Sequence, residues 1–340
     1  RRLKIIKNYR KPGRLLDVGC GLGALLKTAA GAEINFTCSV EPKSQAEADK
    51  IVVAGEKAQW QVAKVEASSA VRRAKAPFTT STLQQAASSR LGYSPAITMR
   101  LAQKLYEAGH ISYMRTDSTN LSTVAVGEIT EVIKKDFGVK YSKPQQYTAK
   151  SKNAQEAHEA IRPTHASVKS VSAGSQEQKL YRLIWQRTVA SQMADAELLK
   201  TKITATALDE VVPAFVANGQ QVIFPGWLSA DPEARGEDVE LPGVKEGESL
   251  TLKKLKATGK ETEPPHRYSE AGLVKELEKR GIGRPSTYAS TIKTIIDRGY
   301  VDKQDRTLKP TETGEVVSDF LSEYFGQYIS DTFTAEMEDE

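Results

Sequence analysis

The sequence has few of the residues from which several classes of protein are built. It contains two cysteines, Cys20 and Cys38, and four histidines among 340 residues. Two cysteines cannot form the disulfide framework of a small secreted protein or a four-cysteine zinc site, so we expect a cytoplasmic protein. No apolar run approaches the ~20 residues that a membrane helix needs, and no charged-then-apolar leader opens the chain. We therefore expect no membrane partner.

The charge balance permits nucleic acid as a partner without requiring it. Lys and Arg number 48 and Asp and Glu 43, which gives a formal net charge of +5. Hydrophobic residues make up 39% and charged residues 27%, a composition typical of globular chains. The length corresponds to about two domains. Composition therefore leaves the function to be inferred from motifs.

Apolar periodicity and capping signals predict a mainly helical chain that contains two regions of strands. The clearest helix is 95–108, because Ser94 can cap it, Pro95 suits its first position and Gly109 can end it. The other expected helices are 45–58, 81–90, 176–196, 270–280, 286–298 and 315–328. The expected strands are 60–65, 202–208, 214–219, 221–224 and 249–252, and 231–248 is expected to be a loop.

An internal similarity links two parts of the chain. The segments that run through Gly92 to Gly109 and through Gly283 to Gly299 each read helix, turn, helix, glycine, strand. This is the order of a winged helix-turn-helix unit, which favours contact with DNA. Two unrelated helical hairpins would give the same order, so both interpretations stay open.

The segment 111–120 (ISYMRTDSTN) carries a candidate nucleophile. We expect a short strand over 111–114, which would place Tyr113, Arg115 and Asp117 on one face. A phenol ordinarily has a pKa near 10 and needs help to attack, and an arginine two residues away can hold a phosphoryl oxygen. The pattern suits attack on a phosphodiester, and a structural tyrosine beside a surface arginine is the alternative.

A second polar cluster occupies residues 151–164 and contains His158 and Arg162 among acids and amides. Little apolar periodicity explains these residues as core. His158 is therefore a candidate for handling protons and Arg162 for binding phosphate. The alternative for His158 is a hydrogen-bonded structural histidine.

A third candidate lies in 281–290 (GIGRPSTYAS), where a helix is expected to start. Helix N-termini favour anions, and Ser286 and Thr287 open this helix with Arg284 just before it. The segment can hold a phosphate of a nucleic-acid backbone. A well-capped helix without a ligand is the alternative.

These motifs together resemble the type IA DNA topoisomerases. The similarity rests on 77–85 (PFTTSTLQQ), 113–118 (YMRTDS), 157–163 (AHEAIRP) and 281–290, and it runs from about residue 32–45 to the end. The resemblance implies that Tyr113 forms a 5′-phosphotyrosyl link to one DNA strand and that Arg115 and His158 assist at the scissile phosphate. It also implies that Arg284 and Thr287 hold the single strand, and we expect the aromatic Tyr288 or nearby groups to take part in this binding.

The resemblance further implies relaxation of negatively supercoiled DNA by strand passage in the nucleoid. The chain has no Walker-type sequence, in keeping with religation without ATP. The family uses Mg²⁺ held by acids of a Toprim domain, and no such acidic cluster occurs here. We therefore expect an incomplete fragment that is inactive alone and needs a Toprim domain in cis or in trans. A single-stranded DNA-binding module that does not cleave is the alternative.

For the fold, the resemblance implies an α+β, mainly helical chain that curves around a hole wide enough for a duplex. Winged-helix-like tyrosine and gate domains are joined by an antiparallel β-arch. We expect the arch in 32–72 and 198–268, the tyrosine domain in 73–197, part of the single-strand-binding gate domain in 269–340, and an unassigned leader in 1–31.

The leader has a resemblance of its own. The stretch 14–23 (RLLDVGCGLG) is similar to the glycine-rich motif of class I S-adenosylmethionine-dependent methyltransferases. There the motif forms a strand, a turn and a helix that approach the cofactor, and Glu41 could imitate the ribose-binding acid. A complete sheet would be needed, and only one such unit precedes the topoisomerase-like sequence. We therefore expect a fused or misassembled leader.

Overall fold

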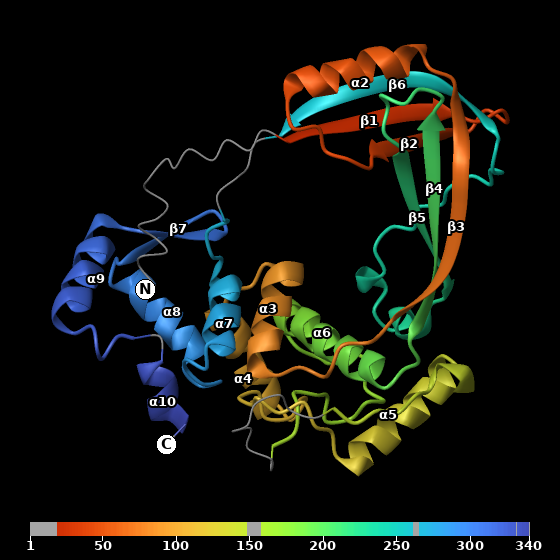
Figure 1. Ribbon diagram of the computed structural model, residues 1–340. Helices are drawn as coiled ribbons and strands as arrows, with labels where there is room; N and C mark the ends of the chain where they lie inside the picture. The colour runs from red at the N-terminus through yellow and green to blue at the C-terminus, as the bar shows by residue number, and fades with distance from the viewer. Residues whose placement is uncertain (1–18, 148–157, 261–264, 331, 340) are drawn as a thin grey trace.

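The protein consists of a β-barrel and a helical layer joined by long strands. The computed structural model describes residues 19–147, 158–260, 265–330 and 332–339. Figure 1 shows that the elements follow a ring, with the barrel at the top, helices at the bottom and strands β3 and β4 along one side. The barrel and the helical layer each have a hydrophobic core of their own. In the described ranges no helix is both long and apolar enough to cross a membrane.

The barrel is closed and antiparallel, with the strand order β1-β2-β5-β4-β3-β6. Its elements are β1 (Gly19–Lys27), β2 (Glu33–Cys38), α2 (Gln45–Lys57), β3 (Trp60–Arg72), β4 (Ala196–Ala207), β5 (Phe215–Phe224) and β6 (Ser249–Lys260). Trp60 anchors the core, because its ring meets Phe215 edge to face at 5.2 Å and its indole N–H donates to the Gly55 carbonyl at 2.9 Å. The strands of 32–72 therefore pair with those of 198–268.

The glycine-rich stretch near the N-terminus has a different structure from the one expected. Gly19, Gly21 and Gly23 lie in β1 and pair with β6, and the chain then turns directly into β2. A methyltransferase motif would turn into a helix at this point, so that interpretation is wrong for residues 19–27. We expected the barrel strands to start at residue 32. Because β1 closes the barrel, they start earlier, at Gly19 in the described chain. Residues 14–18 lie outside the described ranges.

The helical layer follows β3. It contains α3 (Thr80–Leu91), α4 (Pro95–Glu107), α5 (Thr123–Asp136), α6 (Ser175–Ser191) and the 3-10 helices η1 (Val139–Tyr141), η2 (Gly226–Ser229) and η3 (Pro232–Ala234). The capping signals for α4 are confirmed, since the Ser94 hydroxyl accepts from the Ile97 N–H at 3.2 Å. Gly109 follows the helix with a φ of 73°, a conformation that favours glycine.

The C-terminal unit packs against this layer. It contains α7 (Glu270–Lys279), α8 (Tyr288–Asp297), β7 (Val301–Gln304), β8 (Thr307–Pro310), α9 (Glu312–Tyr324) and α10 (Phe333–Asp339). Helix α7 contacts α3, and α8 contacts α4. The order α7, α8 and hairpin β7–β8 is that of a winged helix. The first copy lacks the hairpin, because in the described chain Ile111 forms an isolated bridge with Pro163 and no strand follows α4 before β4. The expected strand over 111–114 is therefore wrong.

Candidate active site around Tyr113

Tyr113 lies on an irregular segment whose side chains alternate between surface and core. The Tyr113 ring is 44% exposed and Arg115 is exposed, whereas Met114 and Thr116 are buried at 1% and 2%. The alternation expected of a strand therefore holds although no strand forms. Tyr113 and Arg115 are both exposed, and the buried residues that alternate with them, Met114 and Thr116, fix the segment to the helical core.

Thr80, the first residue of α3, holds this segment from behind. Its side chain is fully buried, and its hydroxyl donates toward the carbonyls of Met114 at 2.8 Å and Thr116 at 3.1 Å. The same hydroxyl accepts from the Thr116 N–H at 2.9 Å, and the Thr80 N–H donates to the Thr116 carbonyl. These bonds fix the backbone on both sides of Arg115. The motif 77–85 therefore supports the backbone of the Tyr113 segment, a role that the sequence alone did not reveal.

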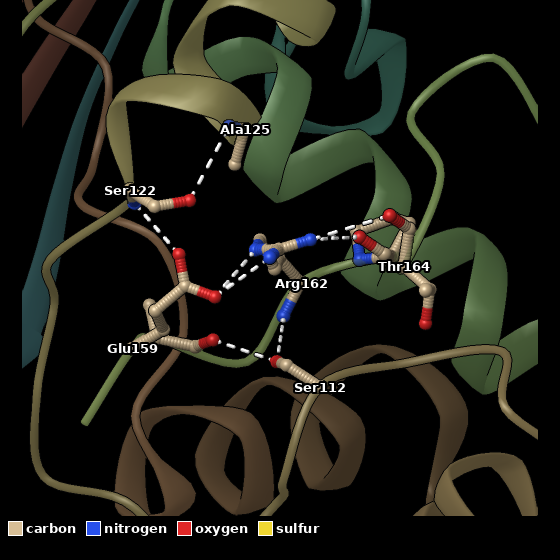
Figure 2. Close-up of polar contacts among 8 residues, drawn as sticks. Ser112, Ser122, Ala125, Glu159, Arg162 and Thr164 are labelled. Carbon is tan, nitrogen blue, oxygen red and sulfur yellow. Dashed lines mark hydrogen bonds and ion pairs between the residues drawn. The ribbon is translucent and has the colours of Figure 1, made fainter.

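Ser112 joins Tyr113 to the segment around 160–164. The Ser112 N–H donates to the Arg162 carbonyl at 2.9 Å, and the Ser112 hydroxyl accepts from the Arg162 N–H at 2.9 Å. The hydroxyl also donates to the Ala160 carbonyl at 2.7 Å. Figure 2 shows the hydrogen bond from the Arg162 N–H to the Ser112 hydroxyl. Two of the motifs found in the sequence are therefore neighbours in space.

The Arg162 side chain is directed at the protein itself. Its Nε and Nη2 donate to one Glu159 oxygen at 3.0 and 2.6 Å, and its Nη1 donates to the carbonyls of Pro163 and Thr164 (Figure 2). The other Glu159 oxygen accepts from the Ser122 N–H at 2.6 Å. This geometry favours a positioning role for Arg162 over the DNA contact that the sequence predicts.

Glu159 is the anchor of this network, and its charge is stabilised there. Burial by itself would raise the pKa of Glu159. The hydrogen bonds from Ser122 and Arg162 outweigh burial, so the pKa of Glu159 lies below its usual value. The carboxylate is therefore ionised at neutral pH and holds segment 159–164 against the start of α5.

His158 lies at the edge of the same segment. Its side chain is exposed, and residues 148–157 just before it are outside the described ranges. The neighbouring Ala160 N–H donates to the Asn120 carbonyl at 2.8 Å, which places the histidine's segment beside the end of the Tyr113 segment. In the part of the chain that the structure describes, no hydrogen bond joins His158 to Tyr113 or Arg115. Its expected role thus stays a prediction.

Tyr106 is a neighbour of Tyr113 that no pattern in the sequence singled out. It lies in the last turn of α4, and its ring meets the Tyr113 ring at 5.3 Å with an interplanar angle of 68°. Edge-to-face pairs of this kind stabilise the orientation of both rings. Tyr106 therefore limits the directions in which the Tyr113 hydroxyl can point.

The turn 281–287 precedes a helix as expected, but the Thr287 side chain bonds within the turn and does not cap that helix. Gly281 and Gly283 have φ values of 68° and 81°, which glycine adopts readily. The Thr287 hydroxyl accepts from the Arg284 N–H at 2.9 Å and makes no cap bond to α8. Ser286 and Thr287 are exposed, so a ligand can reach them. Helix α8 starts at Tyr288 rather than at residue 286.

Tyr288 does not offer a surface for stacking on DNA bases. Its ring is only 7% exposed and packs with Val274 and Ile292 in a small core between α7 and α8. Of the groups expected to hold a single strand, the structure therefore leaves Arg284, Ser286 and Thr287 at the surface turn. The Ser81 hydroxyl donates to Glu278 of α7, which ties this unit to α3.

Magnesium does not fit the residues at hand. In the described ranges no group of three or more His, Cys, Asp or Glu side chains could hold a metal ion. Mg²⁺ prefers octahedral sites built on carboxylates.

Comparison with known proteins agrees with these motifs. The sequence profile of a family described as DNA topoisomerase matches residues 25–340. DNA topoisomerase 1 of Pseudomonas aeruginosa is 46% identical over 327 residues, which cover 92% of this chain and 37% of that protein. DNA topoisomerase 1 of Salmonella typhimurium is 49% identical over 291 residues, which cover 84% and 33%.

A solved structure has the same fold. Full-length topoisomerase I from Thermotoga maritima superposes with a TM-score of 0.83 at 33% identity, and the match covers 99% of this chain and 56% of that one. The chain spans about a third of the length of the curated relatives named above. On the profile match and these identities, the chain belongs to the bacterial type IA DNA topoisomerase family.

Proposed function

We propose that this chain carries the cleavage and religation centre of a type IA DNA topoisomerase, with Tyr113 as the nucleophile. Arg115 and His158 assist at the scissile phosphate, and the surface turn with Arg284, Ser286 and Thr287 holds the single strand. Strand passage through the transient break then relaxes negatively supercoiled DNA.

The observation that carries this proposal is the exposed pair Tyr113 and Arg115 on a rigid support. Thr80 and Ser112 fix the backbone on both sides of the pair, and Tyr106 orients the phenol ring. Fixed placement of a nucleophile beside a charged donor is what a transfer reaction needs.

The reaction exchanges one phosphoester bond for another. The Tyr113 oxygen bonds to phosphorus and loses its proton, and the bond between phosphorus and the 3′ oxygen of the preceding nucleotide breaks. That oxygen takes up a proton and leaves as a 3′-hydroxyl, so the 5′ phosphate stays on the tyrosine. Arg115 stabilises the charge on the phosphoryl oxygens in the transition state. Religation reverses these steps, and no ATP is consumed.

The test is a covalent adduct. The chain is mixed with the Toprim domain of a relative, Mg²⁺ and end-labelled single-stranded DNA, denatured, and searched by mass spectrometry for a phosphotyrosine. We expect the label on Tyr113, no adduct with Tyr113→Phe, and a loss on the order of 10²–10³ in cleavage rate with Arg115→Ala. An adduct on another tyrosine, or one that survives Tyr113→Phe, would contradict the proposal.

The second candidate function is single-strand binding without cleavage. It is favoured by the lack of a three-ligand metal cluster in the described residues. Binding that falls with salt, together with no adduct when the Toprim domain and Mg²⁺ are present, would favour this candidate.

A further inference from the structure

The start of helix α3 carries a run of buried hydroxyl groups. Thr79, Thr80 and Ser81 are 6%, 0% and 2% exposed. A helix needs one hydroxyl to cap its first turn, and Thr79 supplies it, because its side chain accepts from the Thr82 N–H at 3.3 Å. Thr80 holds the Tyr113 segment. The buried hydroxyl of Ser81 is needed for neither task.

The Ser81 hydroxyl instead bonds to the C-terminal unit. It donates to the carboxylate of Glu278, which lies in the last turn of α7 and 197 positions further along the chain. Helices α3 and α7 pack against each other, and Figure 1 shows them side by side. The contact between Ser81 and Glu278 therefore joins the layer that carries Tyr113 to the unit that carries the turn 281–287.

Two helix ends meet at this contact, and their partial charges favour it. The C-terminal end of a helix is partially negative, so the Glu278 carboxylate is unfavourably placed within α7 itself. The N-terminal end of a helix is partially positive, and the first turn of α3 contains no acid of its own. Glu278 supplies that acid from another helix, so the end of α3 and the Ser81 hydroxyl both stabilise its charge.

Glu278 is also the residue at which the surface turn begins. Its backbone carbonyl accepts from the Gly281 N–H at 3.0 Å. Further along the turn, the Arg284 N–H donates to the Thr287 hydroxyl at 2.9 Å. The side chain of Glu278 is thus bound to α3 while its backbone holds the first glycine of the turn.

Adjacent residues at the start of α3 therefore contact two distant segments. Thr80 bonds to the backbone on both sides of Arg115, and Ser81 bonds to Glu278. Neighbouring residues of a helix keep a fixed rise of about 1.5 Å and a fixed rotation. The route from the surface turn to the Tyr113 segment consequently runs through a helix and two side-chain contacts, which together set a distance.

We propose that Ser81 and Glu278 are positioning residues for DNA cleavage, because their contact sets the distance between the surface turn and Tyr113. The inference rests on the proposed function and adds two residues that act through the turn rather than on the reacting atoms. Phosphoryl transfer depends steeply on placement, and a displacement of about 1 Å can slow a reaction about 10²-fold. Without the contact, the turn would still bind a strand but would present it to Tyr113 in several positions.

The test compares Ser81→Ala and Glu278→Ala with Ser89→Ala as a matched control. Ser89 lies in the same helix, and its hydroxyl donates to the Ala86 carbonyl within α3. Each variant is mixed with the Toprim domain of a relative, Mg²⁺ and end-labelled single-stranded DNA. Three quantities are measured: the dissociation constant of the strand, the rate of adduct formation at saturating DNA, and the positions of cleavage on a sequencing gel.

We expect Ser81→Ala and Glu278→Ala to form the adduct about tenfold more slowly, a loss typical of one hydrogen bond to a charged group. Strand affinity should stay close to that of wild type, and a larger share of cleavage should fall at positions beside the preferred one. The double variant should be no slower than either single variant, because all three lack the same contact. Glu278→Gln, which keeps an acceptor oxygen, should recover most of the rate, and Ser89→Ala should behave as wild type.

The outcomes separate this inference from the proposed function. A wild-type rate and cleavage pattern in Ser81→Ala, additive losses in the double variant, or an equal loss in Ser89→Ala would overturn the inference. A loss of strand affinity as large as the loss of rate would overturn the positioning role. Glu278 is exposed, so Glu278→Ala gives the same reading if Ser81→Ala is unstable. A wild-type chain that forms no adduct would instead refute the proposed function, and this inference with it.

Discussion

Replacing Thr80 with valine should loosen the Tyr113 segment, because one buried hydroxyl serves three backbone groups. Valine keeps the shape of the side chain but cannot donate or accept. The Thr116 N–H, whose residue is 2% exposed, then loses its acceptor, and the Met114 carbonyl loses its donor. The Thr116 carbonyl keeps its bond from the Thr80 N–H.

The size of the effect follows from these two orphaned groups. A buried donor or acceptor left without a partner costs about 1–3 kcal/mol, so we expect the free energy of unfolding to fall by about 2–6 kcal/mol. Thr98→Val is the matched control. Thr98 is also fully buried, but its hydroxyl donates only to the Ser94 carbonyl, which also accepts from the Thr98 N–H. Its loss should stay below about 1 kcal/mol.

Urea unfolding followed by circular dichroism measures the stability of both variants, and hydrogen exchange measures the Thr116 amide. The Thr116 amide should be protected in wild type and in Thr98→Val and should exchange faster in Thr80→Val. Equal stability losses in the two variants, with the Thr116 amide still protected in Thr80→Val, would refute the assignment of Thr80 as the support of this segment.

Three further predictions concern buried polar groups. Burial raises the pKa of Tyr181 to about 12. The buried, neutral phenol therefore contributes its full stability below about pH 10, and this contribution is lost as the pH rises toward 12. Between about pH 10 and 12 the melting temperature of wild type should fall more steeply than that of Tyr181→Phe. Because the pKa of Glu159 is lowered, Glu159→Gln should be less stable than wild type at pH 7, and the two should converge in acid as pH falls below the usual carboxylate range; a constant difference down to pH 2 would contradict this. Arg90→Met should cost about 3–5 kcal/mol because it leaves the buried Asp231 carboxylate unpaired, and adding Asp231→Asn should restore part of the loss in urea unfolding.

The sequence by itself determined those features that depend on neighbouring residues. The cap and stop signals around 95–108 gave helix α4, and similar periodicity gave α3, α6 and α7. The alternation of exposed Tyr113 and Arg115 with buried Met114 and Thr116 was also visible in the sequence, although the strand expected there does not form. Long motifs in order indicated the family, which the comparisons confirm.

Only the tertiary structure decided the features that depend on distant partners. The glycines of β1 pair with β6 more than 200 residues away, so a strand forms where local sequence suggested a turn and a helix. Glu159 and Ser112 occupy the donors of Arg162, and the contact of α7 with α8 buries Tyr288, although both residues read as DNA contacts in the sequence. Burial and hydrogen bonding depend on which distant segments come into contact, and the order of residues along a single chain does not reveal those contacts.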